Sequence, residues 1–454
     1  MKRATALGII ATLSLAVIAG FVYVRNGGSR AATNLTFAFT GDVRGRLVPC
    51  GCFTGQLGGL TRVATLLGRG SPEFIKADIG DAIEGSEDYD RIQYRYILKA
   101  FQEMGYEAVN LGHREAALSA PQLRELKQSA AVPMLSANLL DAATGAPLFD
   151  SHRIIRRGPW RIALIGVMDS SIPADALGEG LAVERIETAL SRLLPSLKQQ
   201  ADFIVLLAFT NEATMRSLAR EFYELNVILG GKVSQPSQEL SKENRTLILY
   251  VTNESRAAGV LQVKLDAPGK MTPVKGEVLL VHDRVPEDSA IQLLAGAYRE
   301  EVRRTKLEID DPERLEAGMV PGVKNLAKYA GTESCVTCHS SAAHVWSDTG
   351  HAHAFATLLH AKADADPKCI GCHTVGFQSP SGYRREFRET KLVNVGCESC
   401  HGPGSLHVEQ RLAGAERPAR FRPLGAGDCQ KCHHGEFSRP FDWDKFWPLV
   451  RHTK

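Results

Sequence analysis

The residues most suited to chemistry in this chain are concentrated near its C-terminus. The pentapeptide Cys-x-x-Cys-His occurs four times there, and successive copies lie 34, 28 and 32 residues apart. This pentapeptide is typical of covalent c-type haem attachment. Two thiols bond to the porphyrin, and the adjacent histidine binds the iron as its proximal ligand. Four copies predict four haem c groups, because neither chance nor a redox dithiol explains so many.

The motifs assign a role to each of their cysteines and histidines. The predicted haem-attaching cysteines are Cys335, Cys338, Cys369, Cys372, Cys397, Cys400, Cys429 and Cys432. The predicted proximal ligands are His339, His373, His401 and His433. A second histidine on an iron gives a low-spin centre suited to electron transfer, whereas an open position permits binding of a small molecule. The histidines that remain for this sixth position are His344, His351, His353, His360, His407, His434 and His452.

The other two cysteines, Cys50 and Cys52, lie in a glycine-rich segment that follows the first predicted strand. A Cys-Gly-Cys sequence can close a small, strained disulfide, either structural or redox-active, or offer two thiolates to a soft metal. Arg44 and Arg46 lie nearby in sequence and would lower the pKa of a thiol. These three interpretations stay open at this point.

Composition limits the kinds of partner. The 454 residues carry a formal net charge of +3 without long basic runs, so nucleic acid is not an expected partner. The chain begins Met-Lys-Arg and continues with an apolar run to Val24, which fits an export signal but is long enough to span a bilayer. We expect an uncleaved anchor in residues 1–31, with a cleaved signal as the alternative, and an extracytoplasmic location for the rest.

Alternating strand and helix patterns must position a second group of polar residues. Apolar runs at 35–39, 74–79, 108–111, 162–167, 204–209 and 227–229 are separated by helical stretches, which is typical of an α/β fold with parallel strands. Residues 246–281 are strand-rich without intervening helices, and residues 289–307 predict a charged helix. From position 328 onward aliphatic residues become scarce, so haem would have to serve as the core of that segment.

Residues 329–454 resemble the tetrahaem cytochrome c-554 family. The matching stretches begin at Tyr329, Trp346, Gly396 and Phe441, and the third reads Gly-Cys-Glu-Ser-Cys-His-Gly-Pro-Gly. In that family three haems typically have two histidine ligands and one keeps an open or weakly held site. The resemblance implies His351, His407 and His452 as distal ligands, with His353 as the next candidate.

Residues 34–283 resemble the metallophosphatase domain of secreted 5′-nucleotidases. The matching stretches are Phe-Thr-Gly-Asp42, Ile-Gly-Asp81, Leu-Gly-His113-Arg-Glu, Ser-Ala-Asn138 and Ile-Leu-Gly-Gly231. The resemblance implies a layered α/β fold and a two-metal site that activates water against a phosphate ester.

Several of the ligands that this family requires are replaced. Asp42 and Asp81 remain, and His113 occupies the position of a ligand asparagine. The family's other histidines correspond here to Arg44, Arg114, Phe209, Lys232 and Ser234. Two carboxylates and one imidazole are too few for two divalent ions. We therefore predict a vestigial site made of Asp42, Asp81 and His113, without phosphatase activity.

The sequence as a whole predicts four segments and one leading function. The segments are a signal or anchor (1–31), a nucleotidase-like α/β domain (34–283), a helix and linker (284–327), and a tetrahaem module (328–454). We expect a multihaem c-type cytochrome that exchanges electrons with redox proteins or quinol-linked donors and contacts the membrane through its N-terminal segment. An oxidoreductase acting on a small inorganic substrate, at an open haem or at Cys50/Cys52, and an active phosphoesterase with a cytochrome tail are the alternatives.

Overall fold

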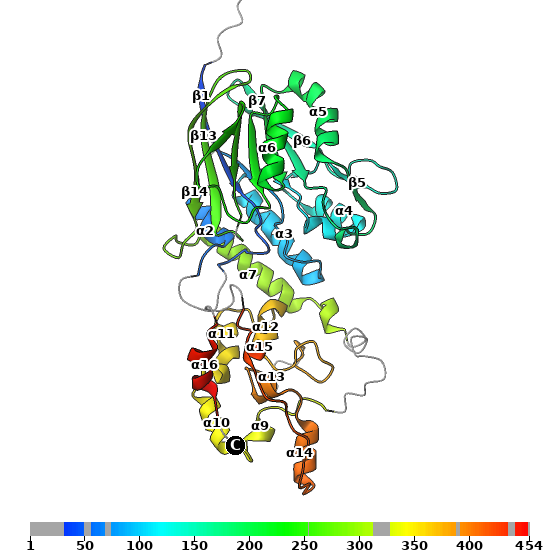
Figure 1. Ribbon diagram of the computed structural model, residues 1–454, viewed down its shortest axis with the longest axis vertical. Helices are drawn as coiled ribbons and strands as arrows, with labels where there is room; N and C mark the ends of the chain where they lie inside the picture. Colours follow the sequence, from blue (N-terminus) through cyan, green and yellow to red (C-terminus); the bar gives the residue numbers. More distant parts are fainter. Residues whose placement is uncertain are drawn as a thin grey trace, which may run out of the picture.

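The computed structural model describes residues 31–49, 56–68, 74–252, 254–311, 327–386, 391–434 and 441–452. An α/β domain and a region of short helices lie end to end, and helix α7 (Ser289–Arg304) runs between them (Figure 1). The expected order, layered sheets with helices and then a mostly helical and irregular module, is confirmed. The predicted N-terminal anchor (apart from Ala31) and both Cys50 and Cys52 lie outside the described residues.

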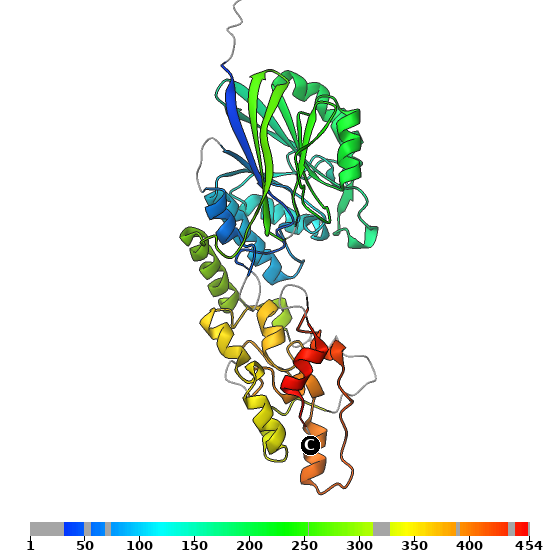
Figure 2. The same ribbon diagram turned by 60° about the vertical axis from the view of Figure 1, so that its left-hand side comes forward.

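Two six-stranded sheets form the α/β domain (Figure 2). The first has the order β14 (Lys270–Leu280), β13 (Ala257–Ala267), β1 (Thr33–Thr40), β2 (Phe74–Asp78), β3 (Tyr106–Asn110) and β4 (Met134–Leu135). The second has the order β11 (Ser241–Glu243), β12 (Thr246–Tyr250), β10 (Val227–Gly231), β9 (Phe203–Phe209), β7 (Trp160–Met168) and β6 (His152–Arg157). A short antiparallel pair, β5 (Leu139–Asp141) and β8 (Leu181–Val183), stands apart from both sheets.

The central strands are parallel, as the alternation of strands and helices predicts. β1 through β4 pair in parallel, and so do β12, β10, β9 and β7. The antiparallel strands lie toward the edges, and the sequence analysis missed β6 because its arginines interrupt the apolar pattern. Carboxyl ends of parallel strands meet at one edge of a sheet, so the polar residues that follow β1, β2, β3, β7 and β10 gather there.

Side chains that alternate along β9 divide the core into two clusters. Phe203, Val205 and Leu207 point to one cluster, which includes the first sheet. Ile204 and Leu206 point to the other, where helices α5 (Ile186–Gln200) and α6 (Glu212–Glu221) cover the second sheet. This is the period-two pattern of a strand that is buried on both faces. The remaining helices of the domain are α2 (Leu60–Leu66), α3 (Asp88–Glu103) and α4 (Ala120–Ser129).

The C-terminal region is built from short helices with little apolar core. They are α9 (Glu333–Val336), α10 (Ser340–Ser347), α11 (Ala354–His360), α12 (Pro367–His373), α13 (Cys397–His401), α14 (Ser405–Leu412), α15 (Ala426–Cys429) and α16 (Trp443–Val450). One small apolar cluster, which includes Phe355, Ile370 and Tyr383, surrounds α12. Through the described part of the chain, no helix is long and apolar enough to cross a membrane.

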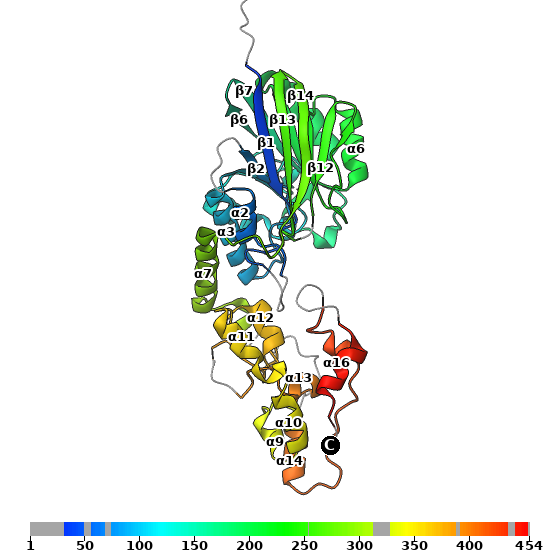
Figure 3. The same ribbon diagram turned by 90° about the vertical axis from the view of Figure 1, so that its left-hand side faces the viewer.

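Helix α7 connects the two regions. Its Tyr298 ring packs against Tyr96 of α3, with centroids 6.0 Å apart, and its Tyr298 hydroxyl donates to Asp366 at 3.1 Å. Figure 3 shows α7 beside α3, with α11 and α12 directly below. The helix that the sequence predicts over residues 289–307 is therefore present, and it contacts both regions rather than extending freely.

Candidate haem-binding and strand-end sites

A cavity of about 3370 Å³ runs among the short helices and reaches the α/β domain. Its volume exceeds the roughly 300–1,000 Å³ of an ordinary ligand pocket several times over. The cysteines and the histidine of all four Cys-x-x-Cys-His motifs line it. A space of this size, lined by four attachment motifs, suits several macrocycles better than one small ligand.

Three of the predicted proximal histidines face a predicted distal histidine across this cavity. The ring centroids lie 6.1 Å apart for His339 and His407, and 6.0 Å apart for His401 and His452. His433 and His351 are also 6.0 Å apart. Two imidazoles that bind one metal ion from opposite sides, with N–metal bonds of about 2 Å, have centroids roughly 6 Å apart. The spacing of all three pairs therefore fits an iron ion between the rings.

Hydrogen bonds and burial prepare several of these rings for metal binding. The Nδ1 atoms of His373, His407 and His452 donate to the carbonyls of Ala354 (2.7 Å), Ala419 (2.8 Å) and Val450 (3.0 Å). Donation from Nδ1 leaves Nε2 as the ligating atom. Burial lowers the pKa of His401, as do the neighbouring imidazoles of His452 and His339. A lowered pKa favours the neutral imidazole, which is the form that binds a metal.

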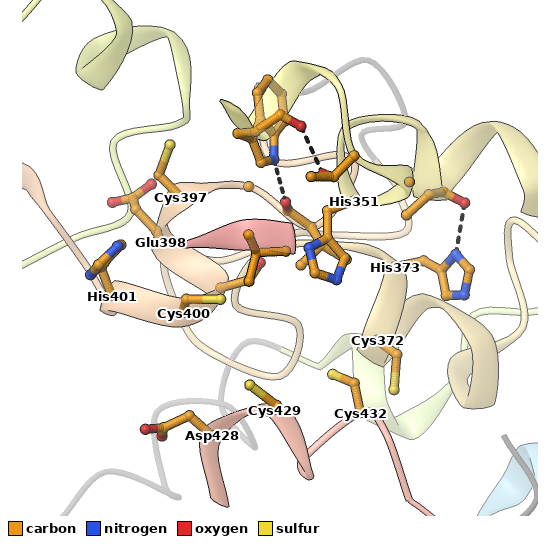
Figure 4. A pocket seen from close by; sticks show the side chains of 18 of the residues that line it. His351, Cys372, His373, Cys397, Glu398, Cys400, His401, Asp428, Cys429 and Cys432 are labelled. Atoms are coloured by element: carbon orange, nitrogen blue, oxygen red, sulfur yellow. Dashed lines mark hydrogen bonds between the residues drawn. The ribbon is translucent and has the colours of Figure 1, made fainter. Parts of the chain in front are cut away.

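His373 differs from the other proximal histidines. Figure 4 shows its Nδ1 bonded to the α11 backbone. Within the ranges that the structure describes, no second imidazole ring is paired with it, whereas the other three motif histidines each have one. His353, the fourth distal candidate, is exposed and contacts none of the four proximal rings in those ranges. In the described part of the chain, the second motif is therefore the one whose histidine has no imidazole ring opposite it.

Contacts between thiols give the spatial order of the motifs. Cys335 of the first motif hydrogen-bonds with Cys397 of the third, and this bond lowers the pKa of the Cys397 thiol to about 7. Cys372 of the second motif bonds with Cys432 of the fourth, and the pKa of Cys372 falls to about 7 for the same reason. Cys400 of the third motif lies close to Cys429 of the fourth (Figure 4). The motifs are therefore neighbours in the order first, third, fourth, second.

A buried carboxylate anchors the third motif. Glu398, which is 3 % exposed, accepts hydrogen bonds from the backbone N–H groups of Ala330 (2.8 Å), Gly331 (2.7 Å) and Gly404 (2.7 Å). These bonds tie the start of the module to the glycines that follow His401. They explain why the glutamate and glycines of the Gly-Cys-Glu-Ser-Cys-His-Gly-Pro-Gly stretch occur together.

The second polar cluster lies at the carboxyl ends of the parallel strands. Asp42 and Arg44 follow β1, Asp81 follows β2, and Lys232 follows β10. Each of these four non-glycine residues has a positive φ, between 46° and 58°. Such backbone conformations are costly and persist where the surrounding structure enforces them, often at functional sites.

Basic side chains in this cluster pair with carboxylates. Arg44 Nε donates to Asp42 at 2.6 Å, and Arg44 Nη1 donates to Glu254 at 3.0 Å. Lys232 Nζ donates to Asp169 at 2.6 Å, and the Nε of Arg114 lies 3.7 Å from Asp81. Arg44 and Lys232 thus form ion pairs with Asp42 and Asp169, and Arg114 lies beside Asp81.

His113, the third residue of the predicted vestigial site, contacts a backbone carbonyl rather than Asp42 or Asp81. Its Nε2 is 2.8 Å from the carbonyl oxygen of Asp169, and burial lowers the pKa of its imidazole. Throughout the described residues, no group of three or more His, Cys, Asp or Glu side chains is arranged to hold a metal ion.

Burial also changes the acid–base state of this cluster. Desolvation, followed by the charge of Glu115, raises the pKa of Asp81 to about 8. Glu115 accepts hydrogen bonds from the backbone N–H groups of Asp81 (3.0 Å), Ala82 (2.8 Å), Ile83 (3.0 Å) and Gly112 (2.8 Å). Four donors favour the charged form of Glu115, so Asp81 is the member of the pair that holds a proton near neutral pH.

Sequence reasoning missed three participants. Asp169 directly follows β7, so its place at a strand end was a usable signal. Glu254 pairs with Arg44, and Lys368 lies 2.9 Å from Asp90 of α3. These two residues offered no signal, because their partners are far away in sequence.

Comparisons with known proteins match each region separately. Residues 334–402 match the family model "Cytochrome c554 and c-prime". Cytochrome c-554 of Nitrosomonas europaea is 40 % identical over 93 residues, which is 17 % of this chain and 40 % of that protein. The C-terminal region therefore resembles this cytochrome family.

The remainder matches 5′-nucleotidases. That of Bos taurus is 23 % identical over 341 residues, which is 66 % of this chain and 57 % of that protein. The 5′-nucleotidase precursor of Thermus thermophilus superposes with a TM-score of 0.52 and 22 % identity, over 62 % of this chain and 66 % of the other. The predicted metallophosphatase-like fold is confirmed. The chain spans less than two thirds of the length of each of these three proteins.

Proposed function

We propose that this protein is an extracytoplasmic c-type cytochrome that transfers electrons through four covalently attached haems. Three proximal–distal histidine pairs with centroids 6.0–6.1 Å apart are the observation that supports it best. When bound, haem c supplies an iron that exchanges one electron at a time. The cysteines of each motif would hold the group, and Nδ1 hydrogen bonds orient the imidazoles of His373, His407 and His452. Haem c attachment in bacteria takes place outside the cytoplasmic membrane, which is also the location we expect for the N-terminal export or anchor segment.

The count of haems per chain tests this function. Pyridine haemochrome analysis of the purified protein is expected to give four haem c groups per polypeptide, and EPR of the oxidised protein three low-spin irons with two histidine ligands. Bare thiols or zinc at the motifs would overturn the proposal.

A second candidate function is favoured by the missing partner of His373. The haem of the second motif would keep an open position, so the protein could bind and reduce or oxidise a small inorganic molecule there. CO or NO added to the reduced protein is expected to shift the Soret band of one haem in four. If no Soret band shifts, electron transfer is the one of these two functions that remains. Cys50 and Cys52, for which the sequence leaves a structural disulfide, a redox-active pair and a metal site open, lie outside the described residues.

The α/β domain, in this proposal, is a scaffold without phosphatase chemistry. Arg44 and Lys232 stand in the cluster paired with the carboxylates of Asp42 and Asp169, and Arg114 lies beside Asp81. Hydrolysis of nucleotides by the purified protein in the presence of Mn²⁺ or Zn²⁺ would instead support the phosphoesterase alternative.

A further inference from the structure

The second haem-binding motif is attached to the α/β domain by a lysine. Lys368 immediately precedes Cys369 and reaches out of the cytochrome module. Its Nζ donates to Glu84 at 2.5 Å and to Gln93 at 2.7 Å, and it lies 2.9 Å from Asp90. Glu84 follows β2, and Asp90 and Gln93 belong to α3. All three partners are therefore residues of the α/β domain.

This contact is largely removed from water. The Lys368 side chain is 16 % exposed and that of Asp90 is 5 % exposed. Burial by itself lowers the pKa of Lys368, but the charges of Glu84, Asp90 and Asp366 outweigh it and raise the pKa overall. The ammonium group is therefore charged. A charge in such surroundings acts more strongly on its neighbours than an exposed one, because water and salt screen it less.

Hydrogen bonds at its N-terminal end also hold α12, the helix that carries the second motif. Asp366 caps α12 by accepting from the Lys368 backbone at 3.1 Å, and it also accepts from Tyr298 of α7. Pro367 and Ile370 are buried. By contrast, α9 and α15 have no buried residue, and the one buried residue of α13 is Glu398. Ile370 packs in the small apolar cluster of the C-terminal region itself, so α12 is bonded to the α/β domain through Lys368 and to α7 through Asp366.

We propose that the α/β domain positions the second haem-binding motif and sets the reduction potential of the haem held there, with Lys368 as the coupling residue. The inference rests on the proposed function, since it requires haem on this motif. A nearby positive charge favours the reduced iron, which carries one positive charge less, so Lys368 raises that potential. Glu84 and Asp90 act in the opposite direction.

Substitutions of opposite charge test the proposal in the full-length haem-loaded protein. Lys368→Met is expected to shift the redox equilibrium of one haem toward the oxidised form by roughly tenfold, a fall of about 59 mV for a one-electron couple. Glu84→Gln leaves the lysine in place and is expected to shift the same haem in the reverse direction. Lys368→Arg and the double variant Lys368→Met/Glu84→Gln are expected to stay close to the wild-type potential.

Lys362→Met is the matched control, because this lysine is exposed and lies six residues from Lys368. It is expected to leave all potentials in place. Spectroelectrochemical titration identifies the affected haem as the one whose Soret band responds to CO. Unchanged potentials in both Lys368→Met and Glu84→Gln, or shifts of equal sign, would overturn the proposal.

A haem count on the same samples separates the role of Lys368 from the proposed cytochrome function. Four haems with unmoved potentials contradict the role of Lys368 and leave the cytochrome function intact. A wild-type protein whose motifs carry no haem c contradicts the cytochrome function itself.

Discussion

At the scale of single residues, neighbouring side chains decide what each histidine can do. His407 and His452 each donate from Nδ1 to a backbone carbonyl, and their rings lie 6.1 Å and 6.0 Å from the ring of a motif histidine. His353 is close to His351 in sequence, yet it is exposed. His351 and His353 therefore have different surroundings although they are two residues apart. The ring of His351 lies 6.0 Å from that of His433, whereas His353 is exposed.

Substitution of single histidines is expected to reveal this difference. His351→Ala, His407→Ala and His452→Ala should each convert one low-spin iron to a high-spin one, because each removes a distal imidazole. His353→Ala is the control and should leave the spin count as it is. EPR and magnetic circular dichroism of the oxidised variants measure the outcome. A change of spin state in the His353 variant would contradict the assignment.

The proton on Asp81 gives a prediction for pH. Burial raises the pKa of this carboxyl from 3.8 to about 8, so the folded protein holds a proton that the unfolded chain releases. The contribution of Asp81 to the free energy of unfolding should therefore fall as pH rises from about 4 to about 8. Asp81→Asn cannot titrate, and its thermal midpoint should gain a few degrees on wild type over that interval. A difference that does not vary with pH, followed by circular dichroism, would show that Asp81 is ionised.

At the scale of elements, the helices of the cytochrome region depend on contacts that their own sequences do not provide. Most are too short to be stable alone. The segment between α7 and the module is held by Arg385, which donates to Asp310 at 2.6 Å and to the carbonyl of Ala365 at 2.9 Å. Both members of this ion pair are buried, with side chains 5 % and 7 % exposed.

Arg385→Ala should destabilise the protein strongly, because it leaves Asp310 buried without its partner. Removal of one member of a buried ion pair typically costs about 3–5 kcal/mol. Arg304 pairs with Glu300 at 2.6 Å but is 78 % exposed. Arg304→Ala should therefore cost less than about 1 kcal/mol. Thermal unfolding of the two variants under one set of conditions compares them, and equal losses would argue against the buried pair.

At the scale of the whole molecule, the two regions share a charged and partly buried interface. Arg303 of α7 pairs with Asp364 at 2.6 Å, in addition to the contacts of Lys368 and Arg385. Glu84 contributes to both regions, since its side chain binds Lys368 and its backbone carbonyl accepts from Arg114 of the strand-end cluster. One residue therefore connects the strand-end cluster with the second Cys-x-x-Cys-His motif.

This interface should keep the halves together after the chain is cut. With a protease site introduced within residues 312–326, the cleaved protein is expected to elute from gel filtration as one species at moderate salt. The contacts of Lys368, Arg303 and Arg385 all join groups on opposite sides of the cut. The same cleavage in a Lys368→Met/Arg385→Ala variant should release two fragments. Separation of the wild-type halves would mean that the connecting chain alone holds them.

The sequence by itself determined the four Cys-x-x-Cys-His motifs, the parallel strands and the polar residues at their ends. These features are local, because a pentapeptide or an apolar period is readable from neighbouring residues. Only the tertiary structure decided which histidine faces which motif, that no described imidazole ring is paired with His373, and that Arg44 and Lys232 pair with carboxylates. It also decided that Lys368 joins the two regions. Such pairings depend on how distant segments pack, and no sequence spacing encodes the distance between them.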